Sequence, residues 1–266
     1  MEIKFEKWQG LGNDFIILNE EAATSELAKK MCDRNFGIGA DGLFSPVESK
    51  NADIAWNFFN SDGTVAQMCG NGIRCFAKFV KSHNLVSKNK FSVETLAGII
   101  SPEILDNGNV LVDMGKPIFD TKKIPVDADF YNRVLVQDFD ATAISMGNPH
   151  CVIFTDEDSE IMAKSFGPII ETDKIFPEKT NVEFVNIISK NKVKMNVWER
   201  GCGITLACGT GACATVVAGV CRELIEKKVD VILPGGILNI FYDQNGTGHV
   251  YMQGPAEFVF KGVYHI

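Results

Sequence analysis

Two cysteines that each open a glycine-rich turn are the residues of this 266-residue chain best suited to chemistry. The first turn reads Cys69-Gly70-Asn71-Gly72, and the second reads Cys208-Gly209-Thr210-Gly211. Each turn precedes a segment with the apolar pattern of a helix. The N-terminus of a helix presents unpaired N–H groups and a partial positive charge, so it stabilises a thiolate and binds a carboxylate. The two turns therefore predict two reactive thiols, each beside an anion-binding stretch of backbone.

The surroundings of the two cysteines repeat as well. Asn60 stands nine residues before Cys69, and Glu199 stands nine residues before the second cysteine. Asn13, which follows a glycine near the start, has a distant counterpart in Asn148, which also follows a glycine. A chain built twice, with a thiol at the same place in each half, predicts two thiols that face one substrate.

Two thiols on opposite sides of one carbon are suited to inverting a stereocentre. One thiolate would remove the α-proton of an amino acid, and the other group, as a thiol, would return a proton from the opposite face. Backbone N–H groups at the two helix starts would hold the α-carboxylate and stabilise the charge of the carbanion. A buried cysteine beside a helix-starting turn would explain either copy alone, but two copies with matching flanks favour two-base chemistry.

Composition excludes several other classes of protein. The net charge of −8 and the isoelectric point near 5.1 disfavour a nucleic-acid groove. No apolar run reaches the roughly 18 residues of a membrane span, and the N-terminus lacks the pattern of a signal peptide. We therefore expect a cytoplasmic protein with reduced thiols. The cysteines show no Cys-x-x-Cys pair, so no metal site is expected; those expected to be small buried apolar residues are Cys32, Cys75, Cys151, Cys213 and Cys221.

The apolar patterns predict an α+β fold of two pseudo-symmetric domains, each a mainly antiparallel sheet around one helix. Strands are expected at 3–8, 15–18, 54–59, 90–96, 109–114, 133–138, 150–154, 181–189, 193–198, 235–242 and 249–260. Helices are expected at 24–33, 72–81, 158–166 and 212–227. Thr24 or Ser25 would cap the first helix, and the last is apolar all round and therefore buried. The turn at 106–109 would join the strands at 90–96 and 109–114. Residues 1–115 with 255–266 would carry Cys69, and residues 116–254 would carry Cys208.

Segments spread over most of the chain resemble the diaminopimelate epimerase family. The matching segments are 10–15, 60–63, 69–75, 146–150, 180–182, 199–201 and 207–213. The resemblance implies two α/β halves with the active site in the cleft between them. It also implies cofactor-independent interconversion of LL- and meso-diaminopimelate, for lysine and peptidoglycan precursors, with Cys69 and Cys208 as the two bases.

The resemblance further implies which residues bind the substrate. Backbone groups at Gly70, Asn71, Gly209 and Thr210 would hold the reacting carboxylate. A second cluster would recognise the distal end of the substrate: Asn60, Asn148, Asn181, Glu199 and Arg200, with Asn13 nearby. Diaminopimelate carries a distal ammonium and a distal carboxylate, which Glu199 and Arg200 are suited to pair. His150 either orients or tunes a cysteine, or is structural.

Two positions depart from the family pattern, and other functions stay open. Ile204 stands where many relatives carry Glu, and Gly42 stands where some carry Gln. One alternative is a racemase of another amino acid, such as histidine, on the same scaffold. Another is a non-catalytic binding protein of the same fold. Some phenazine-type and proline-type relatives differ at one of the two thiols, so the presence of both argues against these. We expect a small amino-acid substrate, no cofactor, no nucleic-acid or membrane partner, and a homodimer.

Overall fold

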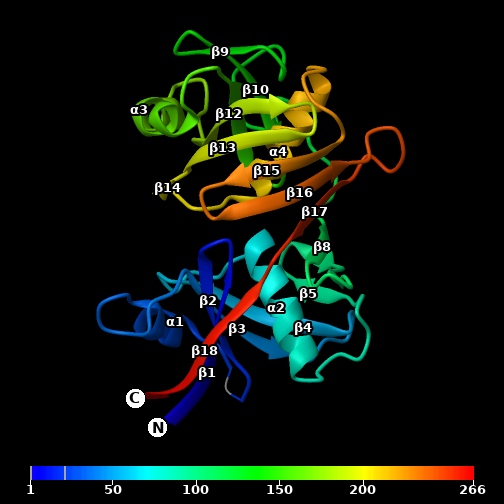
Figure 1. The fold of residues 1–266 in the computed structure, drawn as a ribbon. Coiled ribbons are helices and arrows are strands. Elements are labelled where there is room, and N and C mark those ends of the chain that lie inside the picture. The colour runs from blue at the N-terminus through cyan, green and yellow to red at the C-terminus, as the bar shows by residue number, and fades with distance from the viewer. Residues whose placement is uncertain (1, 21) are drawn as a thin grey trace. The chain divides into compact units, whose positions relative to one another are not determined.

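The computed structural model describes residues 2–20 and 22–266, which form two sheets and few helices, the expected α+β fold. The chain divides into two compact units (Figure 1): residues 1–112 with 254–266, and residues 113–253. The boundaries expected from the sequence, after residues 115 and 254, lie close to these. Cys69 belongs to the first unit and Cys208 to the second.

The first unit is built on one sheet with the strand order β18-β1-β2-β3-β4-β5-β6. Its strands are β1 (Glu2–Gly10), β2 (Asn13–Leu18), β3 (Gly42–Val47), β4 (Ile54–Asn60), β5 (Val93–Thr95), β6 (Gly98–Ile100) and β18 (Glu257–His265). Helix α1 (Ser25–Cys32) follows β2 and is capped by Thr24, as expected. Helix α2 (Gly70–Ser82) follows β4 and packs against β1 and β2. The hairpin β7 (Glu103–Ile104) and β8 (Val110–Asp113) follows β6.

The second unit has the strand order β17-β16-β15-β13-β12-β11-β10-β9, with β14 paired to β13. Its strands are β9 (Val134–Val136), β10 (Phe139–Ser145), β11 (Pro149–Phe154), β12 (Asn181–Ser189), β13 (Lys192–Glu199), β14 (Gly203–Ile204), β15 (Lys228–Leu233), β16 (Gly236–Tyr242) and β17 (Val250–Gly254). Helix α3 (Ser159–Glu171) follows β11, and helix α4 (Gly209–Cys221) packs against β10, β11, β12 and β16.

The two sheets repeat strand for strand. In the first unit β2 pairs parallel with β3 and β4 parallel with β5; in the second, β11 pairs parallel with β12 and β13 parallel with β15. The other pairings in the repeated set are antiparallel. One helix follows the second strand of each repeat and another follows the fourth. The prediction of a chain built twice is therefore confirmed at the level of topology.

Helix α4 shows why its apolar sequence is buried. All but two of its residues, Thr210 and Cys221, are buried, as expected for a helix without a polar face. Gly219 permits close packing, because a Cβ there would lie 2.4 Å from the Ile225 side chain. The helix ends at Cys221 and not at the expected residue 227, because Glu223 adopts a left-handed backbone with φ of 57°.

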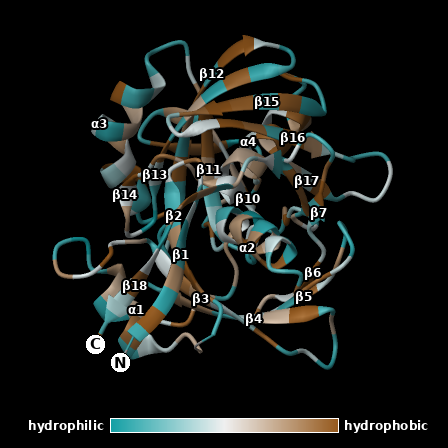
Figure 2. Cartoon of the chain, turned by 60° about the horizontal axis from the view of Figure 1, so that its bottom comes forward, coloured by the Kyte–Doolittle hydropathy of each residue, from teal (hydrophilic) through white to brown (hydrophobic). Residues whose placement is uncertain are grey.

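Several expected elements were wrong in extent or pairing. Strands β3, β6, β7, β10, β14 and β15 were not predicted. The turn at 106–109 joins β7 to β8 and not to the strand near 93, which instead pairs with β4 and β6. The expected strand at 249–260 is two strands, since it breaks at Pro255, which has no N–H to donate to a ladder. Helix α3 runs five residues past the expected end, beyond Pro168, and carries both hydrophilic and hydrophobic residues (Figure 2).

Each unit has its own apolar core. In the first unit, residues of β1, β2, α1 and β3 form one cluster, with Ile3, Ile16, Ala28 and Leu43 fully buried. In the second unit, β10, β11, α3 and β12 supply another, which includes Cys151 and Phe184. Among the described residues, the helices are all too short or too polar to cross a membrane.

Candidate active site

Cys69 is the N-cap residue of helix α2. Its backbone is extended, with φ of −140° and ψ of 120°, and its sulfur accepts a hydrogen bond from the Gly72 N–H at 3.3 Å. Ser, Thr, Asp or Asn usually fills this position, so the sulfur replaces an oxygen as the cap. Gly72 allows the close approach of an aromatic ring, because a Cβ there would lie 2.6 Å from Phe44 Cζ. The hydrogen bond to the sulfur and the packing of Phe44 against Gly72 together fix the turn.

Asn13, which the family resemblance implied as a substrate-binding residue, lies beside the Cys69 sulfur. The thiol donates to Asn13 Oδ1 at 3.6 Å, and Asn71 Nδ2 donates to the same oxygen at 3.3 Å. Asn13 Nδ2 donates to Asp41 Oδ2 at 2.5 Å, which directs the amide oxygen toward the thiol. Arg34 pairs with Asp41 at 2.8 Å. Asp41 was missed from the sequence, although it stands in the glycine-rich loop at 37–42.

Asn60 and Gly70 are held within the same unit. Asn60 is the last residue of β4, and its Nδ2 donates to Thr64 Oγ1 at 3.0 Å. Gly70 begins α2, and its carbonyl accepts a hydrogen bond from Arg74 at 3.1 Å. Arg74 is fully buried and also donates to the Pro255 carbonyl at 3.0 Å. Gly42 has no room for the Gln of some relatives, because a Cβ there would lie 2.6 Å from the Phe58 ring.

Cys208 is the N-cap residue of helix α4 in the same way. Its φ is −118° and its ψ 107°, and its sulfur accepts from the Gly211 N–H at 3.4 Å and lies 3.5 Å from Thr210 Oγ1. Gly209 and Thr210 begin the helix, as Gly70 and Asn71 begin α2. The glycine that follows has a different neighbour here, since a Cβ at Gly211 would lie 2.7 Å from Glu183 Oε1.

The electrostatic surroundings of Cys208 favour the thiol over the thiolate. Burial raises the pKa of Cys208 well above its ordinary value, and the negative charges of Glu199 and Glu183 raise it further. Hydrogen bonds from Thr210 and Gly211 act in the opposite direction but do not outweigh these effects. The pKa of Glu199 is also raised by burial, against hydrogen bonds from Thr205 and Cys208. A carboxyl group thus lies next to the sulfur.

His150 lies in a buried polar chain beside Cys208. Its Nδ1 is 2.6 Å from Glu183 Oε1, and its Nε2 is 3.0 Å from Asn148 Oδ1. His150 and Glu183 are both fully buried. Reasoning from the sequence named His150 and Asn148 but missed Glu183. In the sequence Glu183 alternates with the apolar Val182 and Phe184, a pattern that places it on the solvent face of a strand, whereas the structure buries residues 181–185 throughout.

Asn181 connects two turns of the second unit. Its Nδ2 donates to the Pro149 carbonyl at 2.7 Å, and its Oδ1 accepts from the Arg200 N–H at 2.9 Å. Glu171, which was also missed, holds the same turn. Its carboxylate accepts from Trp198 Nε1 at 2.7 Å and from the Gly201 N–H at 2.8 Å. The Arg200 guanidinium donates to the Glu178 carbonyl at 3.2 Å.

Most of the remaining cysteines are buried, as expected. Burial raises the pKa of Cys32 and of Cys75 to about 12, so both stay protonated. Cys151 and Cys213 are also buried. Cys221 was also expected to be buried, but it is only half-buried. It ends α4, where it shares a hydrogen bond with Tyr131. Ile204, which replaces the Glu of many relatives, is exposed on β14.

Comparison with solved structures shows that the fold is shared with proteins of different named activities. A phenazine biosynthesis protein of the PhzF family from Bacillus anthracis matches with a TM-score of 0.71 at 14% identity, covering 100% of each chain. A hydroxyproline epimerase from Agrobacterium vitis matches with a TM-score of 0.70 at 11% identity, covering 99% of this chain and 91% of that chain. At these identities the likeness concerns the fold alone.

Sequence comparison identifies the family. The model of the diaminopimelate epimerase family matches residues 5–119 and 142–259. The diaminopimelate epimerase of Carboxydothermus hydrogenoformans is 50% identical over 99% of this chain and 100% of its own length. That of Halothermothrix orenii is 45% identical over 98% of each chain. The chain therefore belongs to the diaminopimelate epimerase family, whose members are isomerases.

Proposed function

We propose that this enzyme interconverts LL- and meso-diaminopimelate without a cofactor, by proton transfer between the substrate α-carbon and two cysteines. The observation that carries the proposal is the repeat: Cys69 and Cys208 cap equivalent helices in two units of the same topology. Each sulfur stands beside helix N–H groups that stabilise negative charge. The names of relatives that are about half identical over the whole chain supply the substrate.

The surroundings of the two thiols suggest how the steps are divided. Cys208 rests as a thiol, because burial and two carboxylates disfavour its thiolate. In one direction of the reaction the Cys69 thiolate removes the α-proton, and the Cys208 S–H gives a proton to the opposite face. In the reverse direction the roles exchange. The Glu199 carboxyl group, hydrogen-bonded to the Cys208 thiol, compensates for the change of charge at that sulfur.

Substrate binding follows from the groups beside each sulfur. The backbone groups of Gly70, Asn71, Gly209 and Thr210, at the starts of α2 and α4, hold the reacting carboxylate. The distal ammonium and carboxylate are recognised by the second cluster: Asn13, Asn60, Asn148, Asn181, Glu199 and Arg200. Within it, Asn181 holds the turn that carries Arg200. The Glu199 side chain already accepts hydrogen bonds from Thr205 and Cys208, and its remaining lone pairs are the ones that accept from the distal ammonium.

Deuterium uptake tests the reaction and its substrate together. LL-diaminopimelate and a panel of L-amino acids, including histidine, are incubated with metal-free enzyme in D₂O, with no added cofactor. We expect α-deuterium and inversion with diaminopimelate, and neither with Cys69→Ala or Cys208→Ala. Near-normal inversion by either variant would refute the two-base scheme. Faster reaction with histidine would assign the chain to a racemase of another amino acid, and no reaction at all would support a binding protein.

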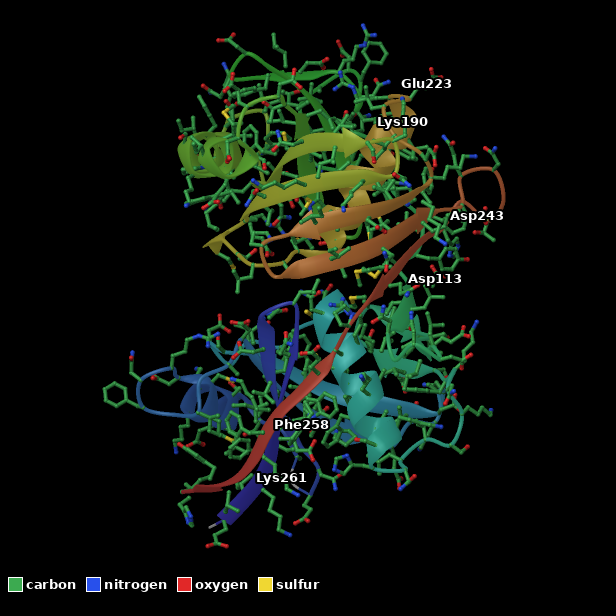
Figure 3. The ribbon with its side chains drawn as sticks, in the orientation of Figure 1. Asp113, Lys190, Glu223, Asp243, Phe258 and Lys261 are labelled. Carbon is green, nitrogen blue, oxygen red and sulfur yellow. The ribbon has the colours of Figure 1, made fainter. Side chains whose placement is uncertain are left out.

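We also propose that the enzyme is a cytoplasmic homodimer that joins through β18. This strand lies at the edge of its sheet and carries exposed apolar residues, among them Phe258, Val259, Phe260 and Val263 (Figure 3). An exposed sheet edge of this kind is a template for pairing with another strand. Sedimentation equilibrium of the wild-type chain and of Val259→Lys tests the proposal. A wild-type monomer, or a variant that still dimerises fully, would contradict it.

A further inference from the structure

Three side chains of the second unit form a compact group of unlike donor atoms. His150 on β11, Glu183 on β12 and Cys208 at the start of α4 each offer one donor atom, and these atoms all lie within 4.8 Å of one another. Strands β11 and β12 pair parallel with His150 opposite Asn181 and Val152 opposite Glu183, so the two side chains point to the same face of the sheet. His150 and Glu183 are fully buried, and Cys208 is 5% exposed.

The donor set matches one class of metal ion. Thiolate sulfur, imidazole nitrogen and carboxylate oxygen are the ligands of Zn²⁺, whereas Mg²⁺ and Ca²⁺ prefer oxygen alone. Zinc bonds of about 2.0 Å to nitrogen or oxygen and about 2.3 Å to sulfur put tetrahedral ligands roughly 3.3–3.7 Å apart. The three atoms therefore need to move by only about 1 Å to bind a zinc ion.

A second observation points to a cation at this place. Glu183 Oε2 is buried and has no hydrogen-bond partner among the described atoms, while Oε1 is already bonded to His150. A buried carboxylate oxygen without a partner is costly, because it has lost its hydration without a replacement. A cation bound by this carboxylate would supply the missing partner without a new donor from the chain, because a carboxylate can bind a metal ion through both of its oxygens.

We propose that His150, Glu183 and Cys208 bind Zn²⁺, and that the bound ion reversibly stops catalysis by occupying the Cys208 sulfur. A sulfur–zinc bond forms, the thiol proton leaves to solvent, and no oxidant or reductant takes part. The binding site rests on the geometry alone, whereas the inhibition rests on the proposed epimerase function. Part of the hydrogen bond between His150 and Glu183 must be given up, so we expect weaker binding than in a permanent structural zinc site.

Cobalt absorption tests the site independently of activity. Co²⁺ is titrated into the reduced, metal-free full-length chain, since a thiolate bound to Co²⁺ gives a charge-transfer band in the near ultraviolet. We expect a band that saturates at about one ion per chain and is displaced by Zn²⁺. Cys208→Ser should abolish the band, and Glu183→Gln and His150→Gln should weaken Co²⁺ affinity at least tenfold. Cys202→Ser, which removes an exposed thiol, and Cys69→Ser are the matched controls and should keep the band.

An inhibition assay with the wild-type enzyme tests the second half of the proposal. Zn²⁺ should reduce epimerisation of LL-diaminopimelate over the concentration range in which it displaces Co²⁺, and a chelator should restore it, while Mg²⁺ should have no effect. A band that survives Cys208→Ser in folded protein would overturn the site. Zinc binding at Cys208 without loss of activity would overturn the inhibition. A Cys208-dependent band in a chain that fails to epimerise would leave the site intact and reject the proposed function.

Discussion

Cys69 and Cys208 occupy the same place in the repeat but have different polar neighbours. Cys69 contacts the Asn13 amide, whose orientation is set by Asp41. Cys208 is buried beside the carboxyl groups of Glu199 and Glu183, and burial first, then these negative charges, raise its pKa and favour the thiol. Two cysteines with similar backbone settings therefore have different polar neighbours. A duplicated fold can thus give its two cysteines different polar neighbours by changing only the side chains around each sulfur.

The glycines that donate to the two sulfurs, Gly72 and Gly211, also have different neighbours in the two units. Gly72 leaves space for the Phe44 ring, and Gly211 leaves space for the Glu183 carboxylate. Both positions are closed to a Cβ, yet the group that takes the space is apolar in one unit and ionisable in the other. The first unit fixes its thiol with an aromatic core, whereas the second fixes it with a buried polar chain.

The largest effect is expected from replacing either sulfur by oxygen. Cys69→Ser and Cys208→Ser should each lower kcat for inversion by about 10²–10⁴, because a serine hydroxyl is a far weaker acid than a thiol and does not form its anion near neutral pH. Serine is a good N-cap residue, so both variants should unfold within a few degrees of the wild type. Steady-state kinetics and thermal unfolding measure the two quantities. A loss of folding in either variant would mean that the sulfur is structural.

Arg200→Lys should lower kcat/KM for diaminopimelate by about 10²-fold, since lysine keeps the charge but loses the planar fork. The lost interaction is with the distal carboxylate of the substrate and does not involve either thiol. Deuterium uptake into an amino acid without a distal carboxylate should change little. If both reactions slow equally, Arg200 supports the turn and does not grip the substrate.

Glu199→Gln sharpens the electrostatic comparison. Removing this negative charge should lower the pKa of Cys208, because the carboxylate raises it in the wild type. Alkylation of Cys208 by iodoacetamide, followed against pH by peptide mass spectrometry in a Cys69→Ser background, reports the shift. The midpoint should move to lower pH. The matched substitution Asn60→Asp adds a charge at the equivalent position nine residues before Cys69, and should move the alkylation midpoint of Cys69 upward in a Cys208→Ser background.

Gly72→Ala and Gly211→Ala should separate packing from chemistry. Overfilling a packed site costs about 1–3 kcal/mol, so both variants should lose stability in urea unfolding. Gly211→Ala should also lower kcat more than Gly72→Ala, since its Cβ displaces the carboxylate beside Cys208 and not an aromatic ring. Equal kinetic effects would show that Glu183 does not influence the thiol.

The smallest effect is expected at Glu171, which holds the turn after β13. Glu171→Gln can keep one of the two hydrogen bonds, so it should destabilise the chain by roughly 1 kcal/mol and raise KM severalfold with little change in kcat. Glu171→Ala should do more on both measures. A selective loss of kcat would place Glu171 closer to the chemistry than the structure suggests.

The sequence alone determined the features that depend on short spacing. The paired Cys-Gly-x-Gly turns predicted a thiol at each helix start, because a cap and its first turn involve only adjacent residues. The apolar run after Cys208 predicted a buried helix. The matching positions of Asn13 and Asn148 indicated a chain built twice, and the structure places Asn13 beside Cys69 and Asn148 beside His150.

Only the tertiary structure decided the partners that are distant in the chain. Glu183 meets His150 across 33 residues, and Asp41 meets Asn13 across 28, through parallel strand pairs whose register no local pattern reveals. The apolar run at 249–260 looked like one strand, but its two parts pair with different units, since strand pairing depends on which edge is available. Neighbouring residues determine the cap and the first turn of each helix, whereas the register of strands far apart in the sequence determines which polar groups lie near each thiol.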